Sequence, residues 1–90
     1  MKEKDYSIKK EKGWHGILYG ECPIQGDGEV DGEKWYFKTR GERWHFEVIG
    51  KPEYNIHEKF TSFPEAGFIS YEESWEFVEE GIKRFRLANQ

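Results

Sequence analysis

Cysteine is nearly absent from this sequence, since Cys22 is the only one among 90 residues and no disulfide can form within the chain. Small secreted domains usually carry two or more disulfides, so the sequence favours a reducing compartment. No apolar run approaches the ~18 residues that a membrane span needs, and residues 1–12 hold no apolar stretch of the kind found in export signals. We therefore expect a cytoplasmic protein with no membrane partner.

Aliphatic side chains are also scarce: Ile, Leu and Val together number twelve, whereas the chain has 7 Phe, 5 Tyr and 4 Trp. Each aromatic side chain can bury ~150–250 Å², so a few of them can fill a small core. A chain of this length buries one core and not two. We expect one domain with an aromatic core.

Basic residues are outnumbered, with 14 Lys and Arg against 18 Asp and Glu, for a net charge of −4. Residues 1–12 contain five of the lysines and little that could pack, which predicts a flexible charged tail ahead of a single domain at 13–90. An arm that orders on a partner is the alternative. The remaining chain is more acidic still, which argues against general binding to a phosphate backbone and suits a protein partner better.

Polarity alternates with period two from residue 24 to 49, and glycine-containing turns interrupt it, as is typical of a three-stranded meander. Asp31-Gly32 predicts a first two-residue turn, and Gly41-Glu42 predicts a second of type II′. These turns set the following opposite pairs: Val30 with Glu33, Gly28 with Trp35, Phe37 with Phe46, and Arg40 with Arg43.

Both hairpins place the apolar side chains on the same face, which is a test of their registers because a slip by one residue would invert a strand. The inner face collects Ile24, Gly26, Gly28, Val30, Trp35, Phe37, Trp44, Phe46 and Val48. We expect the glycines at 26 and 28 to leave room for large rings from the next strand.

Two segments flank the meander. Residues 15–21 are a weaker strand candidate, which Pro23 separates from the meander and which we expect at a sheet edge. Residues 52–67 show no lasting periodicity and contain Pro52 and Pro64, so we expect a connection across the domain, held to the core by aromatic side chains. Those side chains are Phe60, Phe63 and Phe68.

A C-terminal helix is indicated by Ser70 and Glu73, whose spacing is that of a capping box. The apolar stripe that follows repeats at spacings of four and three residues. It comprises Tyr71, Trp75, Val78, Ile82 and Phe85. Gly81 lies inside the helix, where it indicates a close approach to the sheet or a bend. The predicted fold is α+β, with a three- to four-stranded antiparallel meander and this helix packed on one face.

No motif indicates catalysis, a metal or a cofactor. Residues 27–32 imitate the start of a calcium loop, but Lys38 stands where the bidentate Glu is required. The glycines at 26, 28 and 32 lack the spacing and the following helix of a dinucleotide site. The three histidines show no metal-ligand spacing, and an enzyme using Cys22 or a histidine would need contacts that the sequence does not indicate. We expect a protein that is not an enzyme and has no cofactor.

The outer face of the meander is the first candidate binding site. It collects Tyr36, Lys38, Arg40, Arg43 and His45. Arg40 opposite Arg43 is a like-charge pair, which is unfavourable unless an anion or a carboxylate offsets it. One interpretation is an anion or single-stranded nucleic-acid site with one stacking ring; the other is neutralisation by Glu42, Glu47 or another acid of the domain.

The helix carries the second candidate. Phe77 lies about 120° away from the centre of the apolar stripe, near Glu73, Glu76 and Glu80. An exposed ring rimmed by acids is typical of a contact with a basic partner. The alternative is that Phe77 reaches the sheet or the crossing connection.

Residues 28–46 contain the pattern Gly-x-Val-Asp-Gly-x-x-Trp-Tyr-Phe-x-x-Arg-Gly-x-x-Trp-x-Phe. This pattern resembles that of short, uncharacterised bacterial and phage-associated proteins, and it covers about a fifth of the chain. Small acidic phage proteins of this size include anti-CRISPR inhibitors, which occlude a surface of a host defence protein. The resemblance therefore implies an inhibitor that binds a protein.

Together, these observations predict a small intracellular, non-enzymatic protein-binding module, with inhibition of a host defence protein as the role that the resemblance implies. The alternative is a binder of RNA, single-stranded DNA or another anion through the outer face. A homodimer stays open, because an exposed edge strand or the Tyr36 face can pair with its copy.

Overall fold

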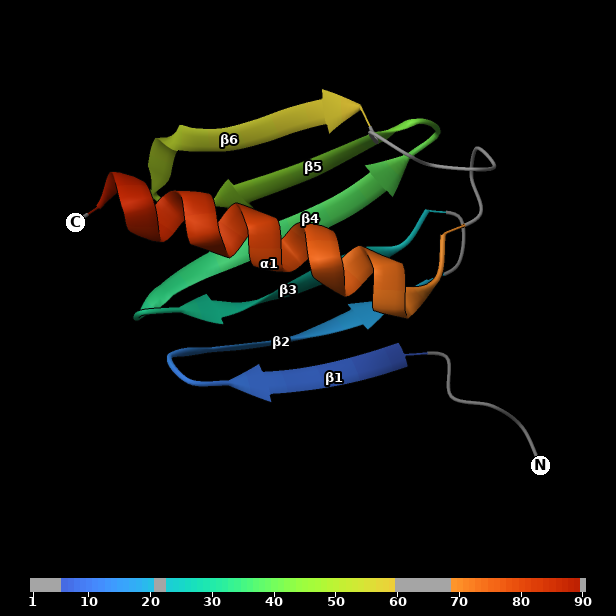
Figure 1. Cartoon of the computed structure of the whole chain (residues 1–90), viewed down its shortest axis with the longest axis horizontal. Coiled ribbons are helices and arrows are strands. Elements are labelled where there is room, and N and C mark those ends of the chain that lie inside the picture. Colours follow the sequence, from blue (N-terminus) through green and yellow to red (C-terminus); the bar gives the residue numbers. More distant parts are fainter. Residues whose placement is uncertain (1–5, 21–22, 60–68, 90) are drawn as a thin grey trace.

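The computed structural model describes residues 6–20, 23–59 and 69–89, with the backbone alone for 51–53. Its strands form one antiparallel sheet whose spatial order is the order of the chain. The elements are β1 (Tyr6–Glu11), β2 (Trp14–Tyr19), β3 (Gln25–Val30), β4 (Glu33–Arg40), β5 (Arg43–Val48), β6 (Lys51–Lys59) and α1 (Tyr71–Ala88). Figure 1 shows α1 lying obliquely across one face of the sheet, and no described element covers the other face.

The α+β class with an antiparallel sheet is confirmed, but the described residues form six strands where three or four were predicted. Within the described residues, no helix combines the length and apolar character needed to cross a bilayer. Cys22 lies outside the described residues, as do Phe60, Phe63 and Phe68, so the predictions made for them are not examined by this structure.

The two predicted hairpins are confirmed in their registers, from Gly28 opposite Trp35 to Arg40 opposite Arg43. Asp31 and Gly32 take φ of 50° and 87°, the pair of positive values that a type I′ turn requires. At the second turn Gly41 has φ of 59°, in keeping with glycine at the first position of a type II′ turn. Local turn chemistry therefore sets the centre of the sheet.

The core lies between α1 and the face of the sheet that it covers. Every non-glycine residue predicted for this face is buried, and Trp35, Phe37 and Phe46 are wholly inaccessible to solvent. Gly28 lies so close to Trp35 that a Cβ there would be 2.8 Å from Cζ2 of the indole. At Gly16 on β2 the distance would be 2.2 Å, so both glycines make room for one large ring.

Helix α1 begins as its capping box predicts. The Glu73 backbone N–H donates to Ser70 Oγ at 3.0 Å, and the Ser70 N–H donates to the Glu73 carboxylate at 3.0 Å. The predicted stripe faces the sheet, although Tyr71 is only half-buried. A Cβ on Gly81 would lie 2.5 Å from the Phe46 ring, so this glycine permits a close approach of helix and sheet.

The prediction of a flexible tail at 1–12 is wrong for residues 6–11, which form β1 and pair with β2. The side chains of β1 that face α1 are polar, and they bind the helix by hydrogen bonds instead of apolar packing. The Trp75 indole N–H donates to Ser7 Oγ at 3.0 Å, and Lys9 Nζ lies 2.6 Å from a Glu79 carboxylate oxygen. A pattern search for apolar alternation on the covered side does not find such a strand.

Two further predictions are corrected. β2 corresponds to the weak strand candidate, but it lies between β1 and β3 and not at an edge. The connection predicted from residue 52 is strand β6 as far as Lys59, where Tyr54 and Ile56 pack against the core. Pro52 is tolerated there because β6 is an edge strand and the proline lies next to its first residue.

Candidate functional site on the open face of the sheet

The face of the sheet opposite α1, here called the open face, has a charge that the whole chain does not suggest. Its strand positions carry six basic and three acidic side chains among those described, a net of +3 in a chain of net −4. The basic residues are Lys10, Lys34, Lys38, Arg40, Arg43 and Lys59, and the acidic ones are Asp27, Glu29 and Glu47. The acids of α1 lie on the other side of the sheet, so the chain as a whole is negative although its open face is positive.

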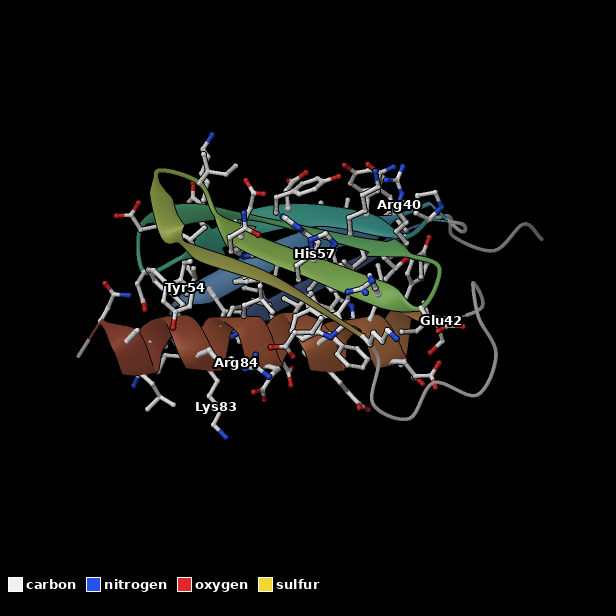
Figure 2. The ribbon with its side chains drawn as sticks, turned by 90° about the horizontal axis from the view of Figure 1, so that it is seen from above. Arg40, Glu42, Tyr54, His57, Lys83 and Arg84 are labelled. Carbon is white, nitrogen blue, oxygen red and sulfur yellow. The ribbon has the colours of Figure 1, made fainter. Side chains whose placement is uncertain are left out.

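Four of these cations form the basic corner, defined by Lys38, Arg40, Arg43 and Lys59. Arg40 lies directly opposite Arg43 across the β4–β5 hairpin, and Lys59 on β6 lies opposite Arg43 on its other side. In Figure 2 Arg40 lies on the side of the sheet away from α1. A hollow of about 210 Å³ opens among these strands, lined by side chains that include Arg40, Arg43 and His57.

The arginines of the basic corner have no carboxylate partner among the described residues, whereas both arginines of α1 do. Arg84 binds Glu58 and Glu80, and Arg86 binds Asp31 through two nitrogens at 2.8 and 2.9 Å. Hydrogen bonds to these carboxylates raise the pKa of both Arg84 and Arg86, and the bond from Arg86 lowers the pKa of Asp31. The guanidinium groups on the covered side are therefore satisfied internally.

Glu47, one of the acids considered for neutralising the arginines, is engaged by a histidine instead. Its carboxylate lies 2.6 Å from Nε2 of His45, two residues away on the same strand. Neither this carboxylate nor that of Glu42 forms an ion pair with Arg40 or Arg43 in the described structure. Among the described residues, no contact therefore supports the interpretation that a carboxylate of this domain neutralises Arg40 and Arg43.

The rings of Tyr36, His45 and His57 belong to the open face and line the same hollow. The His45 ring lies 6.5 Å from Tyr36 and 5.2 Å from His57, edge to face in both contacts. The Tyr36 hydroxyl donates to Gln25 Oε1 at 3.1 Å, which holds the phenol across β3 and β4. The first predicted site is therefore brought together by the structure, and β6 adds His57 to it. Sequence reasoning missed His57 because the alternation of residues 54–57 was too short to identify a strand.

A second hollow, of about 550 Å³, adjoins the first at Tyr36 and is largely apolar. We call it the isoleucine hollow, because Ile8, Ile17 and Ile49 line it. Ile8 on β1 is 67% exposed, and Ile49, which follows β5, is 52% exposed. Ile8 and Ile49 were not predicted as site residues, since Ile8 was assigned to the tail and Ile49, the last residue of the meander, was assigned to neither face.

Polar side chains also line the isoleucine hollow, and its two acids lie together. Asp27 and Glu29 on β3 face Lys34 and Tyr36 on β4. Burial, and then the neighbouring Asp27 carboxylate, raise the pKa of the Tyr19 phenol. The open face thus runs from an apolar region with an acidic edge to a corner that holds cations.

The second predicted site, on α1, is dispersed. The Phe77 ring packs 5.2 Å from the Trp44 ring and joins the margin of the core. Glu73 is engaged in the capping box, and Glu80 accepts from Arg84 Nε at 2.8 Å, whereas Glu76 is exposed. Phe77 reaches the sheet, which was the alternative interpretation of this residue.

Within the described residues, no three side chains of His, Cys, Asp or Glu are grouped so as to hold a metal ion. A scan against protein-family models and searches of curated proteins and of solved structures returned no match to this chain. What this chain binds is therefore inferred from the residues of the open face.

Proposed function

We propose that this chain is a small non-enzymatic module that binds a protein partner through the open face of its sheet. One observation carries the proposal: exposed isoleucines gather around a single hollow on the face that α1 leaves uncovered. Single exposed apolar residues are normal, but an apolar patch with a polar rim is typical of an interaction surface. The resemblance of residues 28–46 to phage-associated proteins supports an inhibitor of a host defence protein as the biological role.

Affinity capture from the native host, followed by mass spectrometry, tests this proposal. The bait is the full chain, compared with the double variant Ile8→Lys, Ile49→Lys, which places two charges on the open face at positions with little burial. The matched control is Leu87→Lys, at an apolar residue of α1 that is 57% exposed. We expect a specific protein with the wild-type chain and with the control, and its loss with the double variant.

Recovery of no specific protein, or equal recovery with all three baits, would contradict a protein partner at this face. Far-ultraviolet circular dichroism and thermal unfolding of each bait show whether the lysines have altered the fold. Sedimentation of the purified chain separately tests the homodimer, which predicts a mass near twice 10.8 kDa.

A second candidate function is binding of single-stranded RNA or DNA at the basic corner. It is favoured by the two arginines without a described carboxylate partner and by the rings of Tyr36, His45 and His57 beside them. Phosphate contacts of this kind predict an affinity that falls steeply with salt. Gel retardation of a labelled single-stranded oligonucleotide should be abolished by Arg40→Glu with Arg43→Glu. It should survive Lys12→Glu with Lys83→Glu, which changes the net charge equally; an unchanged pattern in the arginine variant rules this candidate out.

A further inference from the structure

We infer that the open face recognises a protein segment that is acidic at one end and apolar at the other. Its carboxylates would bind Arg40 and Arg43, its apolar side chains would enter the isoleucine hollow, and Tyr36 would contact the middle. This inference rests on the proposed function, because it specifies the partner of the same face.

We infer the acidic end of the partner segment from Arg40 and Arg43, which have no described carboxylate partner. They lie directly opposite each other on β4 and β5, a like-charge arrangement that is unfavourable in a sheet. A guanidinium group has a planar set of donors that matches a carboxylate, and such bonds are stronger than neutral ones. A partner that covers this corner must supply anions, since burying the cations without them is costly.

The apolar end follows from the lining of the larger hollow. Ile8 on β1, Ile17 on β2 and Ile49 just after β5 present branched aliphatic side chains to this hollow, and none of the three offers a flat ring for base stacking. Asp27 and Glu29, which also line this hollow, would repel a phosphate backbone that continued in this direction. A protein segment avoids that repulsion if its acids are confined to the other end.

The two hollows are close enough for one segment to reach both. Lys34, Tyr36, Lys38 and Arg40 alternate along the open side of β4, and Tyr36 lines both hollows. At ~3.3 Å per residue, the span from residue 34 to residue 40 is about 20 Å. An extended segment of about six residues, or a helix of about thirteen, covers that length.

Display of random twelve-residue peptides on phage, with selection on the full chain, tests the inference without a known partner. We expect enriched peptides to combine Asp or Glu at one end with apolar side chains at the other. Synthetic copies with a fluorescent label then give affinities by anisotropy. Arg40→Gln with Arg43→Gln should weaken binding by about tenfold or more. Ile8→Lys with Ile49→Lys should do the same, whereas Lys12→Gln with Lys83→Gln and Leu87→Lys should change it less than about twofold.

Each contrary result has a distinct meaning. Enriched peptides without acidic residues that still depend on Ile8 and Ile49 would overturn this inference and leave the proposed function standing. Enriched peptides that are insensitive to both double variants, or no enrichment at all, would overturn the inference and also count against protein binding at this face. A (dT)₂₀ oligonucleotide that binds in an Arg40- and Arg43-dependent manner, while no acidic peptide does, would overturn it in favour of the second candidate function.

Discussion

The two faces of the sheet are built from alternate residues of the same strands, yet they have opposite properties. On β4, Trp35 is wholly buried against α1, while its neighbour Tyr36 is half-exposed and lies between two hollows. The covered face excludes water with rings and aliphatic chains, and nearby charges are paired at its margin. On the open face, isoleucines stay in solvent and arginines lack described carboxylate partners.

The two faces therefore have separate roles: the covered face stabilises the fold, and the open face is the proposed binding surface. Substitutions on the covered face should change the free energy of unfolding, because they alter the packing of a small, closely packed core. Substitutions on the open face should leave the fold largely intact and change what the protein binds.

The largest contrast is between neighbours on β4. Trp35→Ala removes a buried indole and should lower the free energy of unfolding by about 3–5 kcal/mol. Tyr36→Ala should cost about 1 kcal/mol, chiefly through loss of the hydrogen bond to Gln25. Urea unfolding measures both. Equal losses would show that the open face also contributes to the core.

Gly81→Ala tests how closely the covered face is packed. Alanine raises helix propensity by about 1 kcal/mol, but its Cβ would lie 2.5 Å from the buried Phe46 ring. We expect overpacking to dominate, with a net loss of about 1–2 kcal/mol in urea unfolding. Lys83→Ala is the control, since this exposed residue of the same helix should change stability by less than about 0.5 kcal/mol. A more stable Gly81→Ala variant would mean that α1 can shift away from the sheet.

Ser74 is a polar exception on the covered face. It is wholly buried, and its hydroxyl has no hydrogen-bond partner among the described residues. Ser74→Ala should therefore stabilise the protein by about 0.5–1 kcal/mol. Ser70→Ala should do the reverse and cost about 1 kcal/mol, because it removes the helix cap. Thermal unfolding compares the two; a destabilised Ser74→Ala variant would reveal a partner for the hydroxyl.

The smallest expected effect is on stability at low pH. The hydrogen bond from Arg86 lowers the pKa of Asp31 in the folded state, so the Asp31–Arg86 pair stabilises the fold above the unfolded pKa of about 4. That contribution is lost as pH falls through the lowered folded pKa. Because both side chains are exposed, it should be below about 1 kcal/mol. Asp31→Asn keeps the turn and should reduce the difference in stability between pH 6 and pH 2; an unchanged pH dependence would exclude the pair as a source.

The parts of the fold that the sequence predicts correctly depend on neighbouring residues. Asp31-Gly32 and Gly41-Glu42 specify two turns, and alternation then assigns each side chain of β3, β4 and β5 to a face. Strand β1 was not predicted because Ser7 and Lys9 contact α1 through hydrogen bonds, so the strand has no apolar alternation on its covered side. Strand β6 was not predicted because Pro52 interrupts a short alternating pattern.

Some residues of the candidate site could be predicted from the sequence, and others could not. Tyr36, Lys38 and His45 belong to one hairpin, so their proximity to the two arginines is predictable from its register. Ile8 and Ile49 join the open face only through the pairing of β1 and the end of β5, and no local rule brings them together. For Phe77, the sequence leaves exposure and core packing equally open, and the contact with Trp44 decides between them.

The hairpin register, the two faces of the central strands and the start and buried stripe of α1 can all be read from the amino-acid sequence alone. These follow from backbone preferences and side-chain periodicity over a few residues. The folded chain was needed to show that β1 and β6 extend the sheet and which cations form ion pairs. The groups involved are remote in the chain, since Ser7 and Trp75 are 68 residues apart and Asp31 and Arg86 are 55 apart. Contacts over such separations depend on how the whole chain packs, which no local pattern encodes.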